Sequence, residues 1–229
     1  NRYKMETQFQ YINRNYPNTI VLIPGWATDC GIFGALDLRF NYIETLKFHP
    51  ADFKEKLLEA LKKHNIKKVS LFGFSMGGFL ATEFARDNKE LIDDIFLIAI
   101  REKYRRDEIT KVRGYLKQSK DAYLSRFYSF SFSKKEEMAH FKKELLKKYL
   151  KKFDTGYLLE LLDYLENMYM MPEALENIKR IKIIHGELDT IAPITEAISI
   201  REKLPAADFV EIKGSGHIPF FRKDFNQYI

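Results

Sequence analysis

A serine between two glycines marks the stretch of the chain best suited to chemistry. Residues 73–78 read Gly-Phe-Ser-Met-Gly-Gly, after a run typical of a buried strand and before a run compatible with a helix. A strand that turns directly into a helix strains the backbone of the residue at the turn. The residues two positions before and two positions after it must then have very small side chains, because a Cβ atom there would clash. We therefore expect Gly73 and Gly77 to lift the Ser75 hydroxyl to the start of the helix as a nucleophile. The blander alternative is a glycine-rich turn with an idle serine.

A serine hydroxyl needs a general base, and the base needs an orienting carboxylate, before it can attack a carbonyl at neutral pH. Two later loops supply these groups in the chain order serine, acid, histidine. Asp189 lies in the loop after the run 181–184, and His217 lies in a glycine-flanked loop after the run 209–212. We expect Asp189 to hold one imidazole nitrogen of His217 while the other nitrogen accepts the Ser75 proton.

The oxyanion of an acyl-transfer reaction needs two backbone N–H donors. Met76, directly after the nucleophile, would supply the first. The second would come from Trp26 in the segment Pro-Gly-Trp, which follows the apolar run 19–23. The Trp26 side chain can at the same time pack beneath neighbouring helices, so the two roles are compatible.

Three other residues could carry chemistry, but each has a simpler interpretation. Cys30 is expected to be a small loop residue because no base is assigned to it, and His185 to satisfy the end of a strand. Glu102, just after a core strand, is an alternative partner for the histidine, although Asp189 is better placed. The five histidines are scattered and no Cys/His pair has metal-ligand spacing, so we expect neither a metal nor a cofactor.

Hydrophobic periodicity predicts an α/β fold with a mostly parallel sheet flanked by helices. Apolar runs of strand length lie at residues 5–11, 19–23, 40–46, 69–72, 92–100, 181–184 and 209–212. Amphipathic or helix-compatible segments lie at residues 50–64, 79–86, 194–203 and 220–229. The alternation of strands and helices indicates one core that can position all three loops described above.

The amino-acid composition and the hydrophobic periodicity change between residues 101 and 177. Charged and aromatic residues dominate there, helical periodicity recurs at 138–149 and 157–168, and no buried strand is predicted. We expect a helical cap at 101–177, inserted into a core formed by residues 1–100 and 178–229. The aromatic cluster Phe127, Tyr128, Phe130 and Phe132 is most simply the core of this cap, or alternatively one wall of an apolar acyl or alkyl pocket.

The net charge of +6 permits an acidic partner without requiring one. Segment 134–152 holds eight lysines and three glutamates, which is usual for a solvated helix face. The functional alternative is a docking face for an acidic protein, carried by Lys142, Lys143, Lys147 and Lys148. The arginines that could carry such docking instead are Arg101, Arg105, Arg106 and Arg113.

Several function classes are not expected from the sequence. It contains no nucleic-acid module signature, and no apolar run approaches the roughly 18 residues of a membrane span. The first residues show no signal-peptide pattern, and the single Cys30 excludes an intramolecular disulfide. We therefore expect a cytoplasmic protein.

Four segments together resemble the α/β-hydrolase superfamily. They are Leu-Ile-Pro-Gly-Trp at 22–26, the serine motif at 73–78, Gly-Glu-Leu-Asp at 186–189 and Gly-Ser-Gly-His-Ile-Pro-Phe at 214–220. Within the superfamily they are similar to the pimeloyl-carrier-protein methyl ester esterases of biotin synthesis. The core match spans about 19–100 and 178–221, whereas 101–177 is similar only in being helical and basic. Pro24 departs from the histidine common in hydrolases, which affects the expected oxyanion loop.

This resemblance implies a serine carboxylester hydrolase that cleaves the methyl ester of a carrier-protein-bound pimeloyl-type acyl chain. In that family basic cap residues hold the acidic acyl carrier protein, which implies the same role for the lysine-rich cap but for no lysine in particular. Two alternatives remain open. One is a thioesterase or small-molecule carboxylesterase without a protein partner, and the other is a non-catalytic binding protein on a hydrolase scaffold.

Overall fold

The protein, here a computed structural model, is described for residues 7–229 and contains a seven-stranded sheet. The strand order is β1-β3-β2-β4-β5-β6-β7, with β1 antiparallel to β3 and every other pair parallel. The strands are β1 (Gln8–Ile12), β2 (Thr19–Ile23), β3 (Asn41–Lys47), β4 (Val69–Phe74), β5 (Ile92–Ile98), β6 (Arg180–Gly186) and β7 (Asp208–Ile212). The α/β class and the mostly parallel sheet predicted from the sequence are confirmed.

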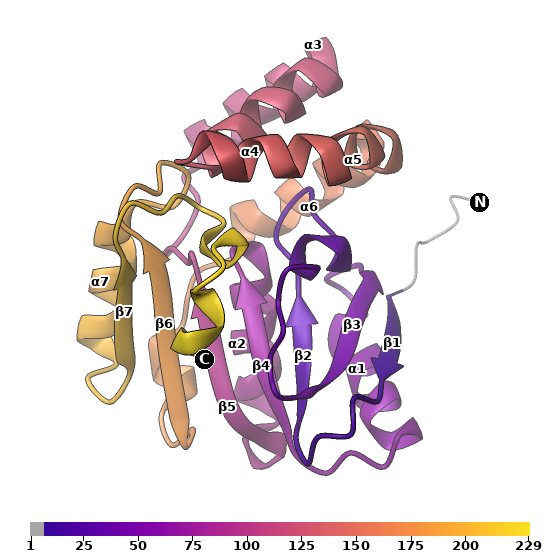
Figure 1. The fold of residues 1–229 in the computed structure, drawn as a ribbon, viewed down its shortest axis with the longest axis vertical. Helices are drawn as coiled ribbons and strands as arrows, with labels where there is room; N and C mark the ends of the chain where they lie inside the picture. Colours follow the sequence, from indigo (N-terminus) through magenta and orange to yellow (C-terminus); the bar gives the residue numbers. More distant parts are fainter. Residues whose placement is uncertain (1–6) are drawn as a thin grey trace.

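The central strands are apolar because both of their faces are covered, as is usual in parallel sheets. Every residue of β2 and of β4 is buried. The helices α1 (Phe53–Lys63), α2 (Met76–Asp87) and α7 (Ile194–Lys203) lie behind the sheet in Figure 1, and the C-terminal segment lies in front of it. The sheet therefore forms the middle layer of the core.

The C-terminal segment differs from the closing helix predicted at 220–229. Two short 3₁₀ turns occupy it, η5 (Pro219–Phe221) and η6 (Phe225–Tyr228), and the backbone between them is extended at Arg222. The rings of Phe220 and Phe225 both pack against Phe72 of β4, with centroid distances of 6.0 and 6.2 Å. The aromatic contacts with the sheet outweigh the helical pattern here.

Small differences affect the predicted strand and helix ends. The expected strand at 5–11 is observed as β1, and the part at residues 5 and 6 lies outside the described residues. The helix after the serine begins at Met76, three residues earlier than its pattern suggested, so Gly77 and Gly78 belong to its first turn. Close packing of this turn explains why glycine, a poor helix former, is found there.

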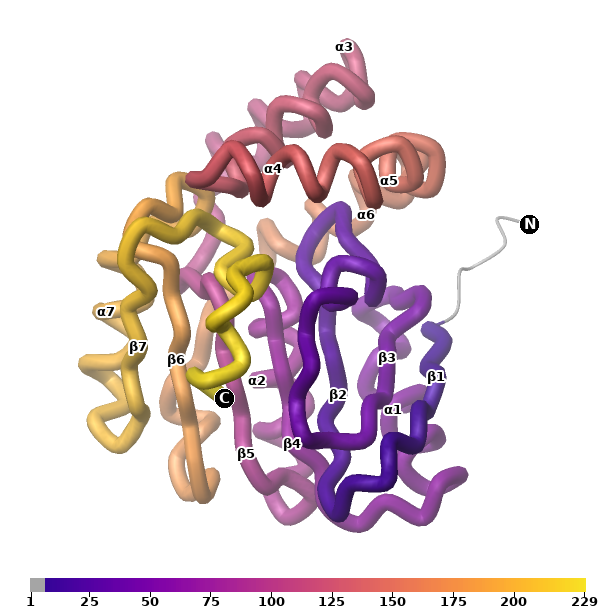
Figure 2. The backbone as a smooth tube through the Cα atoms, in the orientation of Figure 1, coloured from indigo at the N-terminus to yellow at the C-terminus, as the bar shows by residue number. Residues whose placement is uncertain are grey.

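Four further helices lie in the chain between β5 and β6 and above the carboxyl ends of the strands (Figure 1). They are α3 (Arg106–Ser131), α4 (Lys135–Phe141), α5 (Lys147–Lys152) and α6 (Thr155–Asn167), with a π-helical turn at Lys142–Leu146 joining α4 to α5. We call them the helical layer. The segment that follows β7 rises to this layer before it turns back in front of the sheet (Figure 2).

The first turn of α2 approaches the loop after β2 so closely that only glycine fits. A Cβ atom at Gly77 would lie 2.3 Å from the carbonyl oxygen of Ile23 and 2.8 Å from that of Pro24. Gly114, by contrast, lies in α3 with no atom within 4 Å of its would-be Cβ. The two glycines therefore offer a matched pair of substitutions.

We expect Gly77→Ala to lower the free energy of unfolding by about 2 kcal/mol or more, because backbone atoms must move to admit the methyl group. Gly114→Ala should leave it unchanged or raise it by up to about 1 kcal/mol, since alanine favours helix and meets no neighbour there. Urea unfolding followed by circular dichroism measures both changes. Equal stability of the two variants would contradict the close approach of Gly77 to Ile23.

Candidate active site

Ser75 occupies a strained turn between β4 and α2. Its backbone angles are φ 52° and ψ −116°, a region that side chains other than glycine rarely adopt. The Ser75 N–H donates to the carbonyl of Ile98 on the neighbouring strand at 2.8 Å, which holds the turn to the sheet edge. A Cβ at Gly73 would lie 2.7 Å from the Gly77 carbonyl oxygen. The two glycines thus allow the turn that the sequence predicted.

His217 joins Ser75 to Asp189 through two hydrogen bonds. Its Nδ1 lies 2.7 Å from Asp189 Oδ2, and its Nε2 lies 3.0 Å from Ser75 Oγ. A carboxylate can only accept, so Nδ1 carries the proton and Nε2 is left to accept the Ser75 hydroxyl proton. Only 2 % of His217 and 6 % of Asp189 is exposed. The structure thus brings His217 together with Asp189, 28 positions away in the sequence, and with Ser75, 142 positions away.

The Asp189 carboxylate is held from several sides. Its Oδ1 accepts the N–H groups of Ile191 and Ala192, both at 2.8 Å. Burial by itself would raise the pKa of Asp189, but the two neighbouring histidines hold it below its usual range. The group therefore stays an acceptor for His217 at every pH where the protein is expected to work.

His185 is a second histidine on the same carboxylate, a contact that was not predicted from the sequence. It lies at the end of β6, is fully buried, and its Nε2 lies 2.7 Å from the carbonyl oxygen of Ala192 and 3.3 Å from Asp189 Oδ2. Its Nδ1 has no hydrogen-bond partner within residues 7–229. His185 lies at a strand end, but its contacts support the loop that carries Asp189 and not the end of the strand itself.

The loop after β2 lies directly against the nucleophile turn. A Cβ at Gly25 would be 3.1 Å from Ser75 Cβ, which places the Pro24–Trp26 backbone beside the serine. Met76 is the first residue of α2, where a backbone N–H has no acceptor within the helix. Among the hydrogen bonds of the described chain, none uses the N–H of Trp26 or Met76. Both groups are therefore available beside Ser75, which is the arrangement expected of oxyanion donors.

The Trp26 side chain connects the core to the helical layer. Its Nε1 donates to the carbonyl of Leu158 on α6 at 3.1 Å. Its ring packs edge-on against Phe127 of α3 at 5.2 Å and 90°. The packing role foreseen for Trp26 is therefore present together with its position beside Ser75.

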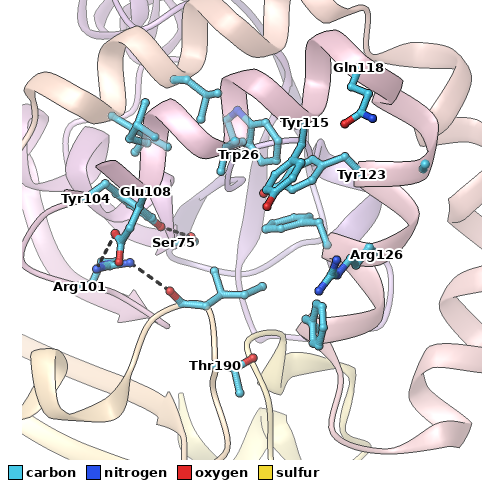
Figure 3. Close-up of a pocket in the computed structure, with 18 of the residues that line it drawn as sticks. Trp26, Ser75, Arg101, Tyr104, Glu108, Tyr115, Gln118, Tyr123, Arg126 and Thr190 are labelled. Carbon is cyan, nitrogen blue, oxygen red and sulfur yellow. Dashed lines mark hydrogen bonds and ion pairs between the residues drawn. The ribbon is translucent and has the colours of Figure 1, made fainter. Parts of the chain in front are cut away.

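A cavity of about 790 Å³ opens at Ser75 between the core loops and the helical layer (Figure 3). Most of its wall is apolar or aromatic, a composition typical of small-molecule sites. The residues that line it are Trp26, Ser75, Arg101, Tyr104, Glu108, Ile109, Val112, Tyr115, Gln118, Ser119, Ala122, Tyr123, Arg126, Phe127, Phe130, Leu162, Leu165, Thr190 and Ile191.

Helix α3 provides most of this wall, and it changes direction at Ser119. The backbone there is extended, with φ −160° and ψ 96°, and interrupts the helix. Ile109, Val112 and Tyr115 face the cavity before the kink, and a stripe that includes Tyr123 faces it afterwards. Spacings of three and four residues place these side chains on one face of α3.

The aromatic cluster, expected to form the core of the cap or alternatively one wall of a pocket, is divided by the structure. Phe127 and Phe130 line the cavity, and Phe130 is 53 % exposed. Phe132 does not line it. Its ring packs against Phe141 and Phe221 at 5.3 and 5.1 Å, because α3 has ended at Ser131 and the chain has turned away. The assignment of Phe132 to the pocket is therefore wrong.

Tyr104 is a cavity residue that the sequence analysis did not identify. Its hydroxyl lies 3.5 Å from Ser75 Oγ, and its ring is stacked under the Arg101 guanidinium at 4.6 Å (Figure 3). Arg101 is buried and is held by Glu108 at 3.2 Å and Glu196 at 2.8 Å. Burial raises the pKa of Tyr104, so its phenol remains neutral at physiological pH. The only available signal was its position just after a core strand.

Two of the alternatives considered earlier are located away from the serine. Glu102 is bound to Lys203 and accepts the Ser199 hydroxyl at 2.8 Å, so it does not serve His217. Burial, together with Asp29 and Glu44, raises the pKa of the Cys30 thiol to about 12. A thiol that stays protonated is a poor nucleophile, which agrees with the simple interpretation of Cys30.

The four lysines considered for docking are exposed on the helical layer. Lys142 and Lys143 lie in the π-helical turn, and Lys147 and Lys148 begin α5. None of them lines the cavity, and Lys143 pairs with Glu144 at 3.4 Å. They remain candidates for contact with another molecule.

No group of three or more His, Cys, Asp or Glu side chains among residues 7–229 has an arrangement that could hold a metal ion. The helices described here are too short or too polar to span a bilayer.

Comparisons with known proteins agree with this architecture. No curated protein sequence matches the chain. A bromoperoxidase from Bacillus anthracis superposes with a TM-score of 0.81 at 18% identity, covering 96% of this chain and 93% of the other. The esterase EaEST from Exiguobacterium antarcticum gives 0.79 at 17% identity, with 92% and 89% covered. At these identities the likeness concerns the fold alone. A model of the alpha/beta hydrolase family matches residues 20–225, so the chain belongs to that family.

Proposed function

We propose that the protein is a serine carboxylester hydrolase in which Ser75 attacks the ester carbonyl. The observation that carries this proposal is the hydrogen-bonded chain from Ser75 through His217 to Asp189, with distances of 3.0 and 2.7 Å, at the floor of a largely apolar cavity. Membership of the alpha/beta hydrolase family supports hydrolase activity. The esterases among the similar structures agree with the choice of an ester.

The geometry suggests how the first half of the reaction would proceed. His217 Nε2 takes the Ser75 proton as Oγ bonds to the carbonyl carbon, and Asp189 stabilises the imidazolium that forms. The carbonyl oxygen becomes negative next to the N–H groups of Trp26 and Met76, where each donor typically contributes about 3 kcal/mol to the transition state. The C–O bond to the alcohol then breaks, and the departing oxygen takes the proton from His217.

The second half repeats these steps with water. A water molecule gives its proton to His217 Nε2 while its oxygen attacks the acyl carbon bound to Ser75. The second tetrahedral intermediate collapses with cleavage of the bond to Oγ, and Ser75 recovers its proton from His217. The acid product leaves, and every group returns to its starting state.

The two halves of the ester have cavities of different size. The large cavity suits an acyl chain, since its wall is mostly apolar. A second cavity of about 10 Å³ is lined by Ser75, His217, Phe74 and Ile218 among others. A space of this size holds about one water molecule, so it suits the hydrolytic water or the alkoxy group of a methyl ester.

The specific substrate proposed is the methyl ester of a pimeloyl-type chain bound to an acyl carrier protein, as in biotin synthesis. Three features support it: the sequence resemblance described above, the small alcohol cavity, and the exposed lysines of the helical layer. In this proposal the segment 101–177 acts as the cap, and its lysines attract the acidic carrier protein. The alternative is a thioesterase or a small-molecule carboxylesterase without a protein partner.

Replacement of the nucleophile tests the reaction class. Ser75→Ala should lower the turnover of p-nitrophenyl butyrate by at least ~10⁴-fold, because no other group takes over the covalent step. Wild-type protein should be labelled at Ser75 by a fluorophosphonate, and the variant should not. A variant that hydrolyses the ester at nearly the wild-type rate would disprove the assignment.

The role of Asp189 gives a second prediction. In Asp189→Asn the N–H groups of Ile191 and Ala192 still require an oxygen at the Oδ1 position. The new amide nitrogen must then face His217 Nδ1, which selects the wrong imidazole tautomer. We expect turnover to fall by roughly 10³- to 10⁴-fold with the thermal stability nearly kept. Glu102→Gln is the control, and a larger loss in that variant would transfer the role to Glu102.

The carrier-protein proposal has its own test. Changing Lys142, Lys143, Lys147 and Lys148 together to Gln should lower kcat/KM for an acyl-carrier-protein methyl ester but not for p-nitrophenyl butyrate, which is neutral. Added salt should slow the wild-type reaction with the carrier more than the variant reaction. The control replaces four exposed lysines near the amino end of β4: Lys62, Lys63, Lys67 and Lys68. Equal rates for wild type and variant at low salt would exclude docking by these four lysines.

A further inference from the structure

One wall of the large cavity carries hydrogen-bond donors that have no acceptor among residues 7–229. They are the guanidinium of Arg126 and the phenol groups of Tyr115 and Tyr123, all on α3. Figure 3 shows the phenol oxygens of both tyrosines pointing into the cavity. Within residues 7–229 neither phenol makes a hydrogen bond, although each is a strong donor.

The positive and negative charges on the cavity wall do not balance. Only Arg101, Glu108 and Arg126 among the lining residues are charged, and Arg101 is neutralised by Glu108 at 3.2 Å and by Glu196 at 2.8 Å. Arg126 has no carboxylate within 4.0 Å in the described part of the chain. One positive charge is therefore left over, and it belongs to a side chain of the cavity itself.

The side chains around Arg126 restrict its position. Its guanidinium lies over the Phe130 ring at 5.4 Å, a contact that covers one face of the group and leaves its in-plane N–H donors free. The Tyr115 and Tyr123 rings are stacked at 5.7 Å and 13°. Burial raises the pKa of Tyr123 to about 12 and the charge of Arg126 opposes this, so the guanidinium is within electrostatic reach of the phenol. The phenol stays protonated and able to donate.

A group that fits these donors must accept hydrogen bonds and carry negative charge. A carboxylate does both, and a single guanidinium can bind its two oxygens with two parallel hydrogen bonds. A phosphate dianion would leave about one charge uncompensated at a site with a single cation. A methyl terminus would leave all three donors without a protein or ligand acceptor. The remaining wall is apolar and suits the methylene chain between the ester and the carboxylate.

We propose that the cavity binds an acyl chain that ends in a carboxylate, with the ester at Ser75 and the carboxylate at Arg126 and the two phenols. The substrate class is then the half-ester of a dicarboxylic acid with a small alcohol. This inference rests on the proposed ester hydrolysis at Ser75. It competes with the carrier-bound substrate, because in that substrate the far carboxyl group is a thioester and carries no charge.

The test compares esters that differ only in the end group of the chain. Mono-p-nitrophenyl esters of adipate, suberate and sebacate are each paired with the p-nitrophenyl ester of the monocarboxylic acid of equal length. The series finds the length that reaches Arg126. At that length, the ratio of kcat/KM for the charged ester to kcat/KM for the neutral ester should fall about fivefold in Arg126→Gln, a modest effect because Arg126 is exposed.

Two further variants make the result specific to this site. Arg126→Lys keeps the charge without the planar fork and should recover part of the preference. Lys117→Gln removes an exposed charge from the same helix at a position outside the cavity, and should leave the ratio unchanged. The preference for the charged ester should also weaken as salt is added. An unchanged ratio in Arg126→Gln, or an equal fall in Lys117→Gln, would overturn the inference.

A binding measurement separates this inference from the proposed reaction. Calorimetry with Ser75→Ala compares the monoamide of suberic acid with octanamide, neither of which reacts. Ser75→Ala should bind the monoamide of suberic acid more tightly than octanamide, and Ser75→Ala/Arg126→Gln should lose this difference. That result supports the anion site even if the wild-type protein hydrolyses no ester, in which case only the proposed reaction fails. Ester hydrolysis without any preference for the carboxylate in either measurement would retain the reaction and reject the site. The ester 3-carboxy-4-nitrophenyl butyrate carries its carboxylate on the alcohol half. If this were the only charged ester that the protein preferred, recognition of a carboxylate at the end of the acyl chain would be rejected, and the anion site would serve the alcohol half.

Discussion

The close approach of the Ile23 carbonyl to Gly77 is the constraint on which the site depends. No Cβ could fit between them, since it would lie 2.3 Å from the oxygen. This contact fixes the loop after β2 against the first turn of α2, so the backbone segments that hold Trp26 and Met76 stay together beside Ser75. In the proposed reaction the N–H groups of these two residues are the oxyanion donors. Donors held before the reaction begins need no reorganisation when charge develops, which is why such a rigid junction favours catalysis.

The parallel sheet collects the remaining groups at one edge, because all of its parallel strands end there. Ser75 follows β4, Tyr104 follows β5, Asp189 follows β6 and His217 follows β7. Tyrosine hydroxyls bond the helical layer to the core: Tyr149 to Asp29 at 2.8 Å, Tyr157 to the Phe48 carbonyl at 2.9 Å and Tyr164 to Glu83 of α2 at 2.6 Å. The cavity between layer and core is therefore formed before any substrate enters.

The polar groups of the site fall into two sets with different roles. Those near Ser75 are paired: Asp189 with His217, and Arg101 with two glutamates. Paired charges keep geometry and add little net field. Those on the wall formed by α3, led by Arg126, are donors without an acceptor among residues 7–229. This difference agrees with the proposed recognition of a substrate by its carboxylate end.

The sequence by itself determined the features that depend on local backbone chemistry. The apolar strands predicted the sheet, and the glycines around Ser75 predicted the turn. Together with the glycine-flanked loop of His217, they predicted the three residues that meet there. These predictions succeeded because glycine positions and strand period are local properties. Only the tertiary structure decided which side chains surround these three residues. Helical periodicity marks the apolar face of α3 but does not show what covers that face. Packing between segments distant in the chain decided the remaining features. These are the kink at Ser119, the exclusion of Phe132 from the cavity, and the positions of Tyr104, His185 and Arg126.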